Sequence, residues 1–250
     1  MNLYKRDKYE DYLTGSVECS PNDAISKYYK LRGMTIIIEG LIGTGKSTAG
    51  YSLTRWLNCN GIKAQYFPEY RNNSLLDQYI KNMPKYAYAF QIFMLQQRIH
   101  IYSEAKRFSE LGGISIIDRS LLGDYTFAKM QKKKGFFTVE EWNVYISLME
   151  HDSEIEPDII MYLHCSPEIS FNRMKLRGIK SEVSGYTLEY FNDLHKAYES
   201  SMADITHAIH KVCWGKDIIP IITLDEKRLL PEDNCIELLD SVVEYFSKAV

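Results

Sequence analysis

The sequence predicts an α/β fold in which helices cover both faces of a five-stranded parallel sheet, giving a three-layer sandwich. Three features predict it: short apolar runs, helical stretches that alternate with them, and a glycine-rich loop directly after the first run. The apolar runs, each expected to form a buried parallel strand, are Met34–Glu39, Lys63–Phe67, Gly113–Asp118, Asp158–Leu163 and Asp217–Leu224. The alternation indicates βαβ units with right-handed crossovers.

Helices are expected between and after these strands. They are Lys46–Leu57, Tyr86–Ser109, Ser120–Lys133, Val139–Glu150, Pro167–Arg177, Thr187–His210 and Pro231–Ser247. Residues 1–33 are polar, charged and rich in tyrosine, so we expect an N-terminal extension there and one domain over residues 34–250. In such sheets ligands bind beyond the carboxyl ends of the strands, and the residues that follow each strand are therefore the candidates for a site.

Composition narrows the possible partners. The chain has 250 residues and a net charge of −3, which suits one domain and gives no sign of nucleic acid or a membrane as a partner. No apolar run is long enough to span a bilayer, and the N-terminus lacks the apolar core of a secretory signal. The five scattered cysteines are Cys19, Cys59, Cys165, Cys213 and Cys235. Without a CxxC pair, we expect neither a zinc site nor disulfides, and reduced thiols in a cytoplasmic protein.

The glycine-rich loop reads GLIGTGKS over Gly40–Ser47 and matches the phosphate-binding pattern GxxxxGK[S/T]. Glycines let backbone N–H groups turn around phosphate oxygens, and the next helix directs the positive end of its dipole at the anion. Lys46 supplies a charge for the outer phosphates, and the Ser47 hydroxyl can ligate Mg²⁺. The alternative is a glycine-rich turn with an exposed lysine. The residues expected to bind a nucleoside triphosphate here are Gly40, Leu41, Ile42, Gly43, Thr44, Gly45, Lys46, Ser47 and Thr48.

Charged residues follow two further strands. Asp118 ends the third apolar run, where an acid opposite a phosphate loop can hold the Mg²⁺ shell, and Arg119 can stabilise charge on a transferred phosphoryl group. The alternative is an aspartate that caps the next helix, with Arg119 on the surface. Glu69 follows the second run and could accept the proton of an attacking hydroxyl. A solvated loop glutamate is the alternative, which spacing alone favours.

A further stretch of the chain predicts a lid. Ser166–Glu182 begins with a helix-start signal, and Arg173 and Arg177 recur at i, i+4, so both lie on one face. Lys180 falls in an expected loop over residues 178–185. The pattern predicts an arginine-bearing lid that closes over phosphates and excludes water, with an amphipathic surface helix as the alternative.

Together these motifs resemble those of the deoxyribonucleoside kinase family, from Met34 to about Val242. The shared pattern is a P-loop, a glutamate after the second strand, an aromatic segment ending in Phe-Gln, an acid-Arg-Ser motif, an arginine lid and a helix with a glutamate. In this chain these are Gly40–Ser47, Glu69, Ala89–Gln91, Asp118–Ser120, Arg173–Lys180 and Leu188–Ser200. The combination is specific, whereas no single motif is.

The resemblance implies a role for each matching position. Glu69 corresponds to the general base that takes the proton of the 5′-hydroxyl, and Arg119 to the residue that bridges the 5′ oxygen and the phosphates. Gln91 corresponds to the amide that pairs with the edge of the base, where one group must donate and accept at once. Arg98 and Asp124 match the pair in members that accept deoxycytidine and deoxypurines, which thymidine-preferring members lack; spacing alone would not identify this pair.

Sugar recognition is where the sequence departs most from the family. Glu199 falls at the position of a glutamate that contacts the 3′-hydroxyl of the sugar. Ile80 stands where the family has a tyrosine that touches the same hydroxyl, and the neighbouring Tyr79 is the candidate substitute. In the lid, Ile179 takes the place of an arginine, with Lys180 beside it.

The resemblance implies a kinase that uses ATP with Mg²⁺ and phosphorylates the 5′-hydroxyl of a deoxyribonucleoside, favouring deoxyadenosine, deoxyguanosine or deoxycytidine over thymidine. It also implies a homodimer. One alternative is a nucleoside monophosphate kinase of the thymidylate type, which needs extra cations for the acceptor phosphate; between Glu69 and Gln91 the chain offers only Arg71, Lys81 and Lys85. The other is a non-catalytic nucleotide-binding module, for which Glu69 would be dispensable.

Overall fold

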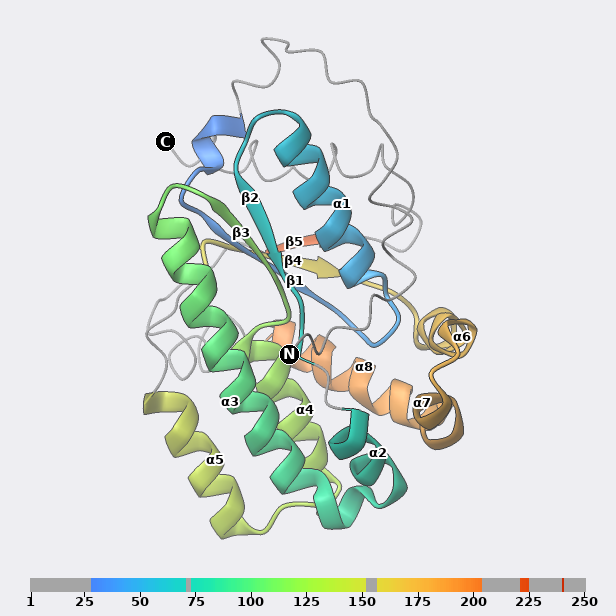
Figure 1. Ribbon diagram of the computed structural model, residues 1–250. Helices are drawn as coiled ribbons and strands as arrows, with labels where there is room; N and C mark the ends of the chain where they lie inside the picture. Colours follow the sequence, from blue (N-terminus) through green and yellow to red (C-terminus); the bar gives the residue numbers. More distant parts are fainter. Residues whose placement is uncertain (1–27, 71–72, 152–156, 204–220, 225–239, 241–250) are drawn as a thin grey trace.

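Five parallel strands form the centre of the molecule, in the order β2-β3-β1-β4-β5 (Figure 1). The computed structural model describes residues 28–70, 73–151, 157–203, 221–224 and 240. The strands are β1 Thr35–Glu39, β2 Ala64–Phe67, β3 Ile114–Asp118, β4 Ile159–Leu163 and β5 Ile221–Leu224. The predicted five-stranded parallel sheet is confirmed, and each strand lies within one of the expected apolar runs.

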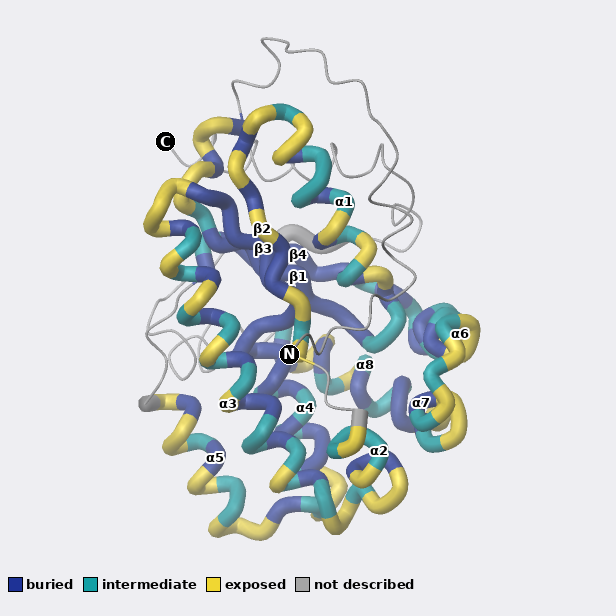
Figure 2. Tube along the Cα trace, viewed as in Figure 1, coloured by how far each residue is buried: buried dark blue, intermediate teal, exposed yellow. Residues whose placement is uncertain are grey.

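Side chains of β1 are buried on both faces of the sheet. On one face, Ile36 and Ile38 pack with Leu53 of α1 (Lys46–Cys59). On the other face, Ile37 belongs to a larger core that includes buried side chains of α3 (Met83–Glu110), α4 (Leu121–Lys133) and α8 (Leu188–Ala203). β1, β3 and β4 are accordingly dark blue in Figure 2. Burial on both faces explains the nearly continuous apolar runs and confirms the three layers.

The ends of two helices differ from the prediction because of their caps. α3 begins at Met83 rather than Tyr86, because the Asn82 side chain accepts a hydrogen bond from the Lys85 N–H and a proline occupies the first turn. α4 begins at Leu121 because Ser120 is its N-cap. The remaining expected helices in the described residues are α5 (Val139–His151) and α6 (Pro167–Arg177).

Two short helices were not predicted: α2 (Asn73–Lys81), and α7 (Lys180–Gly185) where a lid loop was expected. They pack against each other so closely that a Cβ on Gly185 would lie 1.7 Å from Ile80 Cγ2. Such short segments give little periodic signal in a sequence. The end of the expected 187–210 helix, the start of the last run and the 231–247 helix, apart from Asp240, lie outside the described residues.

The carboxyl ends of β1, β2 and β3 meet at the edge of the sheet where α1, α4 and α8 converge (Figure 1). This edge carries the P-loop after Glu39, Glu69 two residues after β2, and Asp118 at the end of β3. In the part of the chain that the structure describes, no helix is long and apolar enough to cross a bilayer.

Candidate active site

The P-loop joins β1 to α1, and its close packing leaves no room for a side chain at two positions. Gly40 and Gly43 have φ of 144° and 85°, which L side chains rarely adopt. A Cβ on Gly40 would lie 2.7 Å from the carbonyl oxygen of Leu163, and one on Gly43 would lie 2.6 Å from that of Ser170. The loop is therefore packed between β4 and α6, with its shape fixed before a ligand arrives.

Lys46 is the buried cation of the P-loop. Its Nζ donates hydrogen bonds to the carbonyl oxygens of Gly40 at 3.0 Å and Leu41 at 2.6 Å. Burial lowers the pKa of Lys46, the positive charge of Arg119 lowers it further, and the pKa lies at about 7 in spite of nearby carboxylates. A triphosphate favours the charged ammonium, so phosphate binding and protonation of Lys46 are coupled.

The two predicted metal residues lie in contact. Asp118 Oδ2 accepts hydrogen bonds from Ser47 Oγ at 2.9 Å and from the Tyr66 hydroxyl at 2.6 Å. Asp118 Oδ1 is buried and has no hydrogen-bond partner among the described residues. A serine hydroxyl beside an unpartnered carboxylate oxygen is a donor set that fits Mg²⁺. Ser120, rather than Asp118, caps α4, so the alternative role expected for this aspartate is wrong.

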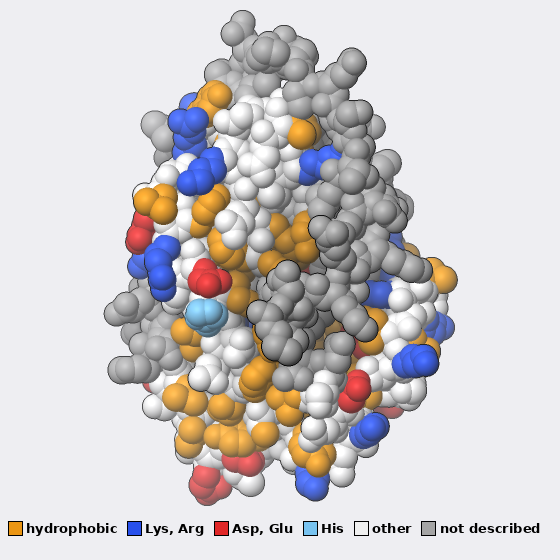
Figure 3. All heavy atoms as spheres, in the orientation of Figure 1, with side chains coloured by type: hydrophobic (Ala, Val, Ile, Leu, Met, Phe, Trp, Pro, Cys, Tyr) orange, Lys and Arg blue, Asp and Glu red, His pale blue; other side chains and the backbone are white. Residues whose placement is uncertain are grey.

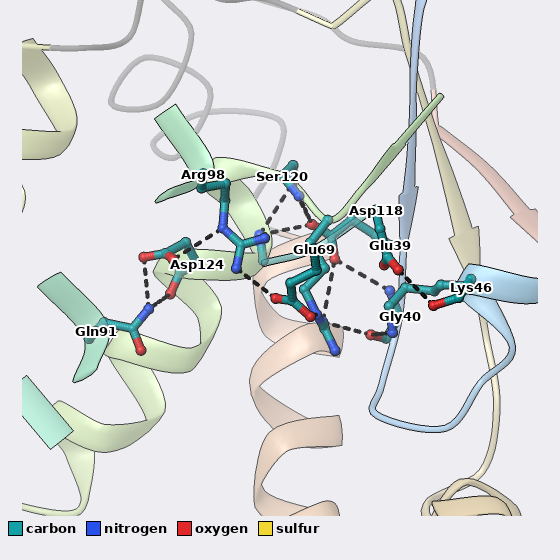
Figure 4. A network of polar contacts seen from close by, with 12 residues as sticks. Glu39, Gly40, Lys46, Glu69, Gln91, Arg98, Asp118, Ser120 and Asp124 are labelled. Carbon is teal, nitrogen blue, oxygen red and sulfur yellow. Dashed lines mark hydrogen bonds and ion pairs between the residues drawn. The ribbon is translucent and has the colours of Figure 1, made fainter. Parts of the chain in front are cut away.

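Glu69 lies between two arginines (Figure 4). Its Oε1 accepts from Arg98 Nη2 at 3.0 Å, and its Oε2 accepts from Arg119 Nε at 3.1 Å. Burial by itself raises the pKa of Glu69, but the positive charges of Arg119, Arg98 and Lys46 outweigh it and hold the pKa at about 2. Its side chain is 22% exposed, at the edge of a small hollow that Arg98 and Asp118 also line. Glu69 is thus an ionised, partnered carboxylate rather than a solvated loop residue.

Arg119 turns from the end of β3 toward the P-loop. Its φ of 74° is the only positive value for a residue other than glycine in the described chain. Such a conformation costs about 1–2 kcal/mol and persists only where its surroundings hold it. Arg119 Nη1 donates to the Gly40 carbonyl oxygen at 2.9 Å and to the Tyr198 hydroxyl at 2.7 Å. At 3% exposure it is no surface arginine, and that alternative is wrong.

Gln91, Arg98 and Asp124 form one buried group. Gln91 Nε2 donates to Asp124 Oδ1 at 2.7 Å and to its main-chain oxygen at 3.1 Å, while Arg98 Nε donates to Asp124 Oδ2 at 3.2 Å. The structure therefore brings together the three residues expected to read the base. Their role toward a base stays a prediction.

Two residues that the sequence did not single out complete this group. Gln131 Nε2 donates to Gln91 Oε1 at 3.2 Å, and the Tyr145 hydroxyl donates to Asp124 Oδ1 at 2.7 Å. Gln131 stands seven residues after Asp124 on α4, so helical spacing was an available signal. Tyr145 comes from α5, and its contact depends on how that helix packs.

Glu39 is a third residue that the sequence did not single out. This last residue of β1 is fully buried. Its Oε1 accepts from the Ser120 N–H at 2.5 Å, the Ser120 hydroxyl and the Gly123 N–H at 3.1 Å. Its Oε2 accepts from the Gly40 N–H at 3.3 Å and the Tyr198 hydroxyl at 3.0 Å. One carboxylate thus joins the P-loop to α4 and α8.

The predicted lid is a pair of helices. Arg177 on α6 donates to Glu182 on α7, and Arg173 Nη1 lies 4.0 Å from Cys165 Sγ. Ser170 Oγ donates to the carbonyl oxygen of Ile42 at 2.6 Å, which fixes α6 to the P-loop. The helix that carries Arg173 and Arg177 thus packs against the P-loop, and the binding of these two arginines to ATP stays a prediction.

Tyr79 and Glu199, both expected at the sugar, lie outside the network around Glu69. Tyr79 is 1% exposed, stacks on Phe90 with ring centroids 4.7 Å apart, and has its hydroxyl 3.3 Å from that of Tyr190. Glu199 Oε1 accepts from the Tyr162 hydroxyl at 3.1 Å. No described contact supports their roles toward a sugar, which stay predictions.

Glu199 also belongs to the one group of possible metal ligands found in the described residues. His164, His195 and Glu199 offer ligand atoms within 4.8 Å of one another. His164 and Glu199 are 38% and 49% exposed, and nothing else at this place indicates an ion. The described cysteines, Cys59 and Cys165, are thiols, as expected; the other three lie outside the described residues.

Known proteins resemble this chain in sequence and in fold. A family model described as "Deoxynucleoside kinase" matches residues 36–246. A deoxyadenosine kinase from Dictyostelium discoideum is 34% identical over 198 residues, which cover 76% of each chain. A thymidylate kinase from Brachyspira hyodysenteriae is 26% identical over 211 residues, covering 82% of this chain and 99% of that protein. The structure of deoxyadenosine kinase from M. mycoides with the products dCMP and dCDP matches with a TM-score of 0.68 at 27% identity, covering 85% of this chain and 100% of that one.

Proposed function

Because this chain belongs to the deoxynucleoside kinase family, we propose that it transfers the γ-phosphate of ATP to the 5′-hydroxyl of a deoxyribonucleoside at the edge where the P-loop and Glu69 meet. One observation carries the proposal: Glu69 is held between Arg98 and Arg119, and Arg119 also contacts the P-loop. A carboxylate fixed beside a phosphate site provides an acceptor for the hydroxyl proton. A module that only bound nucleotide would have no use for it.

In the proposed reaction, Glu69 accepts the proton of the attacking 5′-hydroxyl and Arg119 stabilises the charge that develops on the transferred group. The pKa of about 2 makes Glu69 a weak base in the ligand-free site. Triphosphate binding shares the charges of Lys46 and Arg119 with the phosphates. The two cations then stabilise the Glu69 carboxylate less, and the pKa of Glu69 rises toward a value suited to proton transfer.

Ser47 and Asp118 would hold the Mg²⁺ that accompanies ATP. When bound, the ion neutralises charge on the β- and γ-phosphates. The Tyr66 hydroxyl orients the Asp118 carboxylate, because burial and the neighbouring Asp118 raise the pKa of Tyr66 and keep its hydroxyl a donor. Oriented ligands of this kind support metal binding from the second shell of contacts.

Asp124, with Gln91 and Arg98, gives the proposed preference for deoxyadenosine, deoxyguanosine or deoxycytidine over thymidine. A carboxylate accepts a hydrogen bond from the exocyclic amino group of adenine or cytosine, whereas thymine presents a carbonyl oxygen at the corresponding position; guanine carries its amino group at C2. The relatives from D. discoideum and M. mycoides are named deoxyadenosine kinases, which supports deoxyadenosine as the first substrate to test.

The alternative of a thymidylate-type kinase finds less support in the described residues. Lys81 and Lys85, two of the only three cations that the chain offers between Glu69 and Gln91, are exposed on the surface. Arg71 lies outside the described residues. The buried cations Arg98 and Arg119 are already partnered by Glu69.

A steady-state panel tests the proposal. Deoxyadenosine, deoxyguanosine, deoxycytidine, thymidine and their 5′-monophosphates are each incubated with ATP and Mg²⁺, and the products are separated by ion-exchange chromatography. We expect deoxynucleosides to yield 5′-monophosphates, with thymidine the poorest of the four. Turnover of monophosphates alone would exclude the proposal and favour the thymidylate type.

We also propose that the chain forms a homodimer through α5. Val144 and Leu148 are exposed and lie at i, i+4, so they form an apolar face on this helix. Figure 3 shows hydrophobic side chains gathered at this end of the molecule. Light scattering after gel filtration should give a dimer mass for the natural chain and a monomer mass for Val144→Lys with Leu148→Lys. The control Leu111→Lys, at an exposed position after α3, should remain dimeric.

A further inference from the structure

Glu39 faces hydrogen-bond donors on every side. Its oxygens accept from the N–H groups of Ser120 and Gly123 at the start of α4, and from the N–H of Gly40 in the P-loop. The start of a helix favours a negative charge, because its free N–H groups and its dipole point toward the anion. A fully buried carboxylate is stable here because its acceptors are satisfied.

The direction of the hydrogen bonds around Tyr198 determines that Glu39 acts as an acceptor. Arg119 Nη1 can only donate hydrogen bonds, so the Tyr198 oxygen accepts from it at 2.7 Å. The single proton of the Tyr198 hydroxyl is then free to point at Glu39 Oε2, 3.0 Å away. Glu39 therefore has to be an acceptor on both oxygens. Arg119 Nη1 itself lies 3.9 Å from Glu39 Oε2, close enough for charge attraction.

We propose that Glu39 is a positioning residue for the kinase reaction, whose carboxylate holds Arg119 against the P-loop. It acts on Arg119 from two directions. Its carboxylate accepts from the N–H of Ser120, which follows Arg119, and so fixes the backbone just after the φ of 74° at Arg119. It also orients the Tyr198 hydroxyl, which accepts a hydrogen bond from the Arg119 guanidinium. The inference rests on the proposed role of Arg119 in phosphoryl transfer.

Glu39→Gln is the direct test, because it keeps the shape but replaces one acceptor oxygen with an NH₂ group that faces other donors. We expect kcat for deoxyadenosine to fall roughly 100-fold, as for a small misplacement of a catalytic group, with dissociation constants for ATP and nucleoside changed by less than about threefold. Asp158→Asn is the matched control. The Asp158 carboxylate also accepts a hydrogen bond from a backbone N–H of β1, that of Thr35 at 2.7 Å, but at the other end of the strand. The kcat of the Asp158→Asn enzyme should therefore not change.

A double-mutant cycle separates positioning from general loss of structure. If Glu39 acts through Arg119, adding Glu39→Gln to Arg119→Lys should lower kcat by less than about threefold further, because the group that Glu39 positions is already gone. If the fold-reductions in kcat of the two single variants multiplied in full in the double variant, the inference would be overturned. A Glu39→Gln enzyme with kcat within about threefold of the natural one would overturn it as well. A natural enzyme that phosphorylates no deoxynucleoside would instead refute the proposed function.

Gly123→Ala tests the same contact from α4, should Glu39→Gln fail to fold. A Cβ on Gly123 would lie 2.4 Å from Glu39 Oε1, so the carboxylate has to move. Alanine is favoured over glycine in a helix by about 1 kcal/mol, which helps the variant to fold. We expect its kcat to fall at least about tenfold with the same dependence on Arg119, by analogy with displaced catalytic groups. Full activity of Gly123→Ala would overturn the inference.

Discussion

Arg98 Nη2 donates to Glu69 Oε1 at 3.0 Å, and Nε of the same guanidinium donates to Asp124 Oδ2 at 3.2 Å. Arg98 thus joins Glu69, the proposed general base, to Asp124, which is proposed to recognise the nucleobase. Its side chain is buried, so both contacts are shielded from water and their charges interact strongly. If the nucleobase of a bound nucleoside displaces the Arg98 guanidinium, the electrostatic environment of Glu69 therefore changes as well.

Replacing both members of the base-reading pair should admit thymidine. In Arg98→Met with Asp124→Ala, the buried carboxylate that faces the thymine carbonyl is removed together with its counter-ion. We expect kcat/KM for thymidine, relative to deoxyadenosine, to rise at least about tenfold, the size of one lost unfavourable contact. Arg98→Met alone leaves the buried Asp124 carboxylate without its counter-ion, and this single variant should melt at a lower temperature than the double variant. If the double variant uses thymidine no better, Arg98 and Asp124 do not set the base preference.

ATP binding should take up protons at alkaline pH because of Lys46. Its pKa of about 7 in the ligand-free site lies below the ordinary value of 10.5, so the side chain is mostly neutral at pH 8. The triphosphate favours the charged form and raises this pKa, so binding at pH 8 should take up roughly one proton, and binding at pH 6 almost none. Calorimetry with Mg²⁺ and ATP in buffers of different ionisation enthalpy measures the uptake. Lys46→Met should abolish it, and the exposed control Lys133→Met should leave it intact.

Asp118→Asn should raise the Mg²⁺ concentration needed for half-maximal activity. The substitution removes a charged oxygen that, with Ser47, fits the ion. We expect an increase of about tenfold or more, and a smaller one for Tyr66→Phe, which removes only the hydrogen bond that orients Asp118. Titration of Mg²⁺ at fixed free ATP measures both. An unchanged requirement in Asp118→Asn would remove this residue from the metal site.

Local sequence patterns predicted the parts of the site that lie at the ends of strands or directly after them. The P-loop and Arg119 follow directly after strands, and Asp118 is the last residue of one, so parallel pairing alone brings them to one edge. Glu39 lies equally close to the loop, yet its role depends on Ser120 and Tyr198, which approach only when α4 and α8 pack against β1. Its position at a strand end carried no sign of these partners.

The surroundings of the predicted lid and sugar residues depended on tertiary packing in the same way. Helix α7 forms where Gly178 and Gly185 suggested a loop, because Glu182 meets Arg177 and Gly185 fits against Ile80. Glu199 matched a family position in the sequence, but its carboxylate meets Tyr162 in the folded chain. Sequence position could not determine which way this side chain turns.

Single-turnover phosphoryl transfer by Glu69→Gln tests the central claim most directly. Deoxyadenosine, ATP and Mg²⁺ are mixed with excess enzyme, and product formation is followed by rapid quench. We expect the rate to fall roughly 10²–10⁴-fold while nucleoside binding is kept, because the amide cannot take the 5′-hydroxyl proton. The control Glu104→Gln, an exposed glutamate of α3, should react at the natural rate. Full turnover by Glu69→Gln with nucleoside bound would contradict the assignment of Glu69 as the general base.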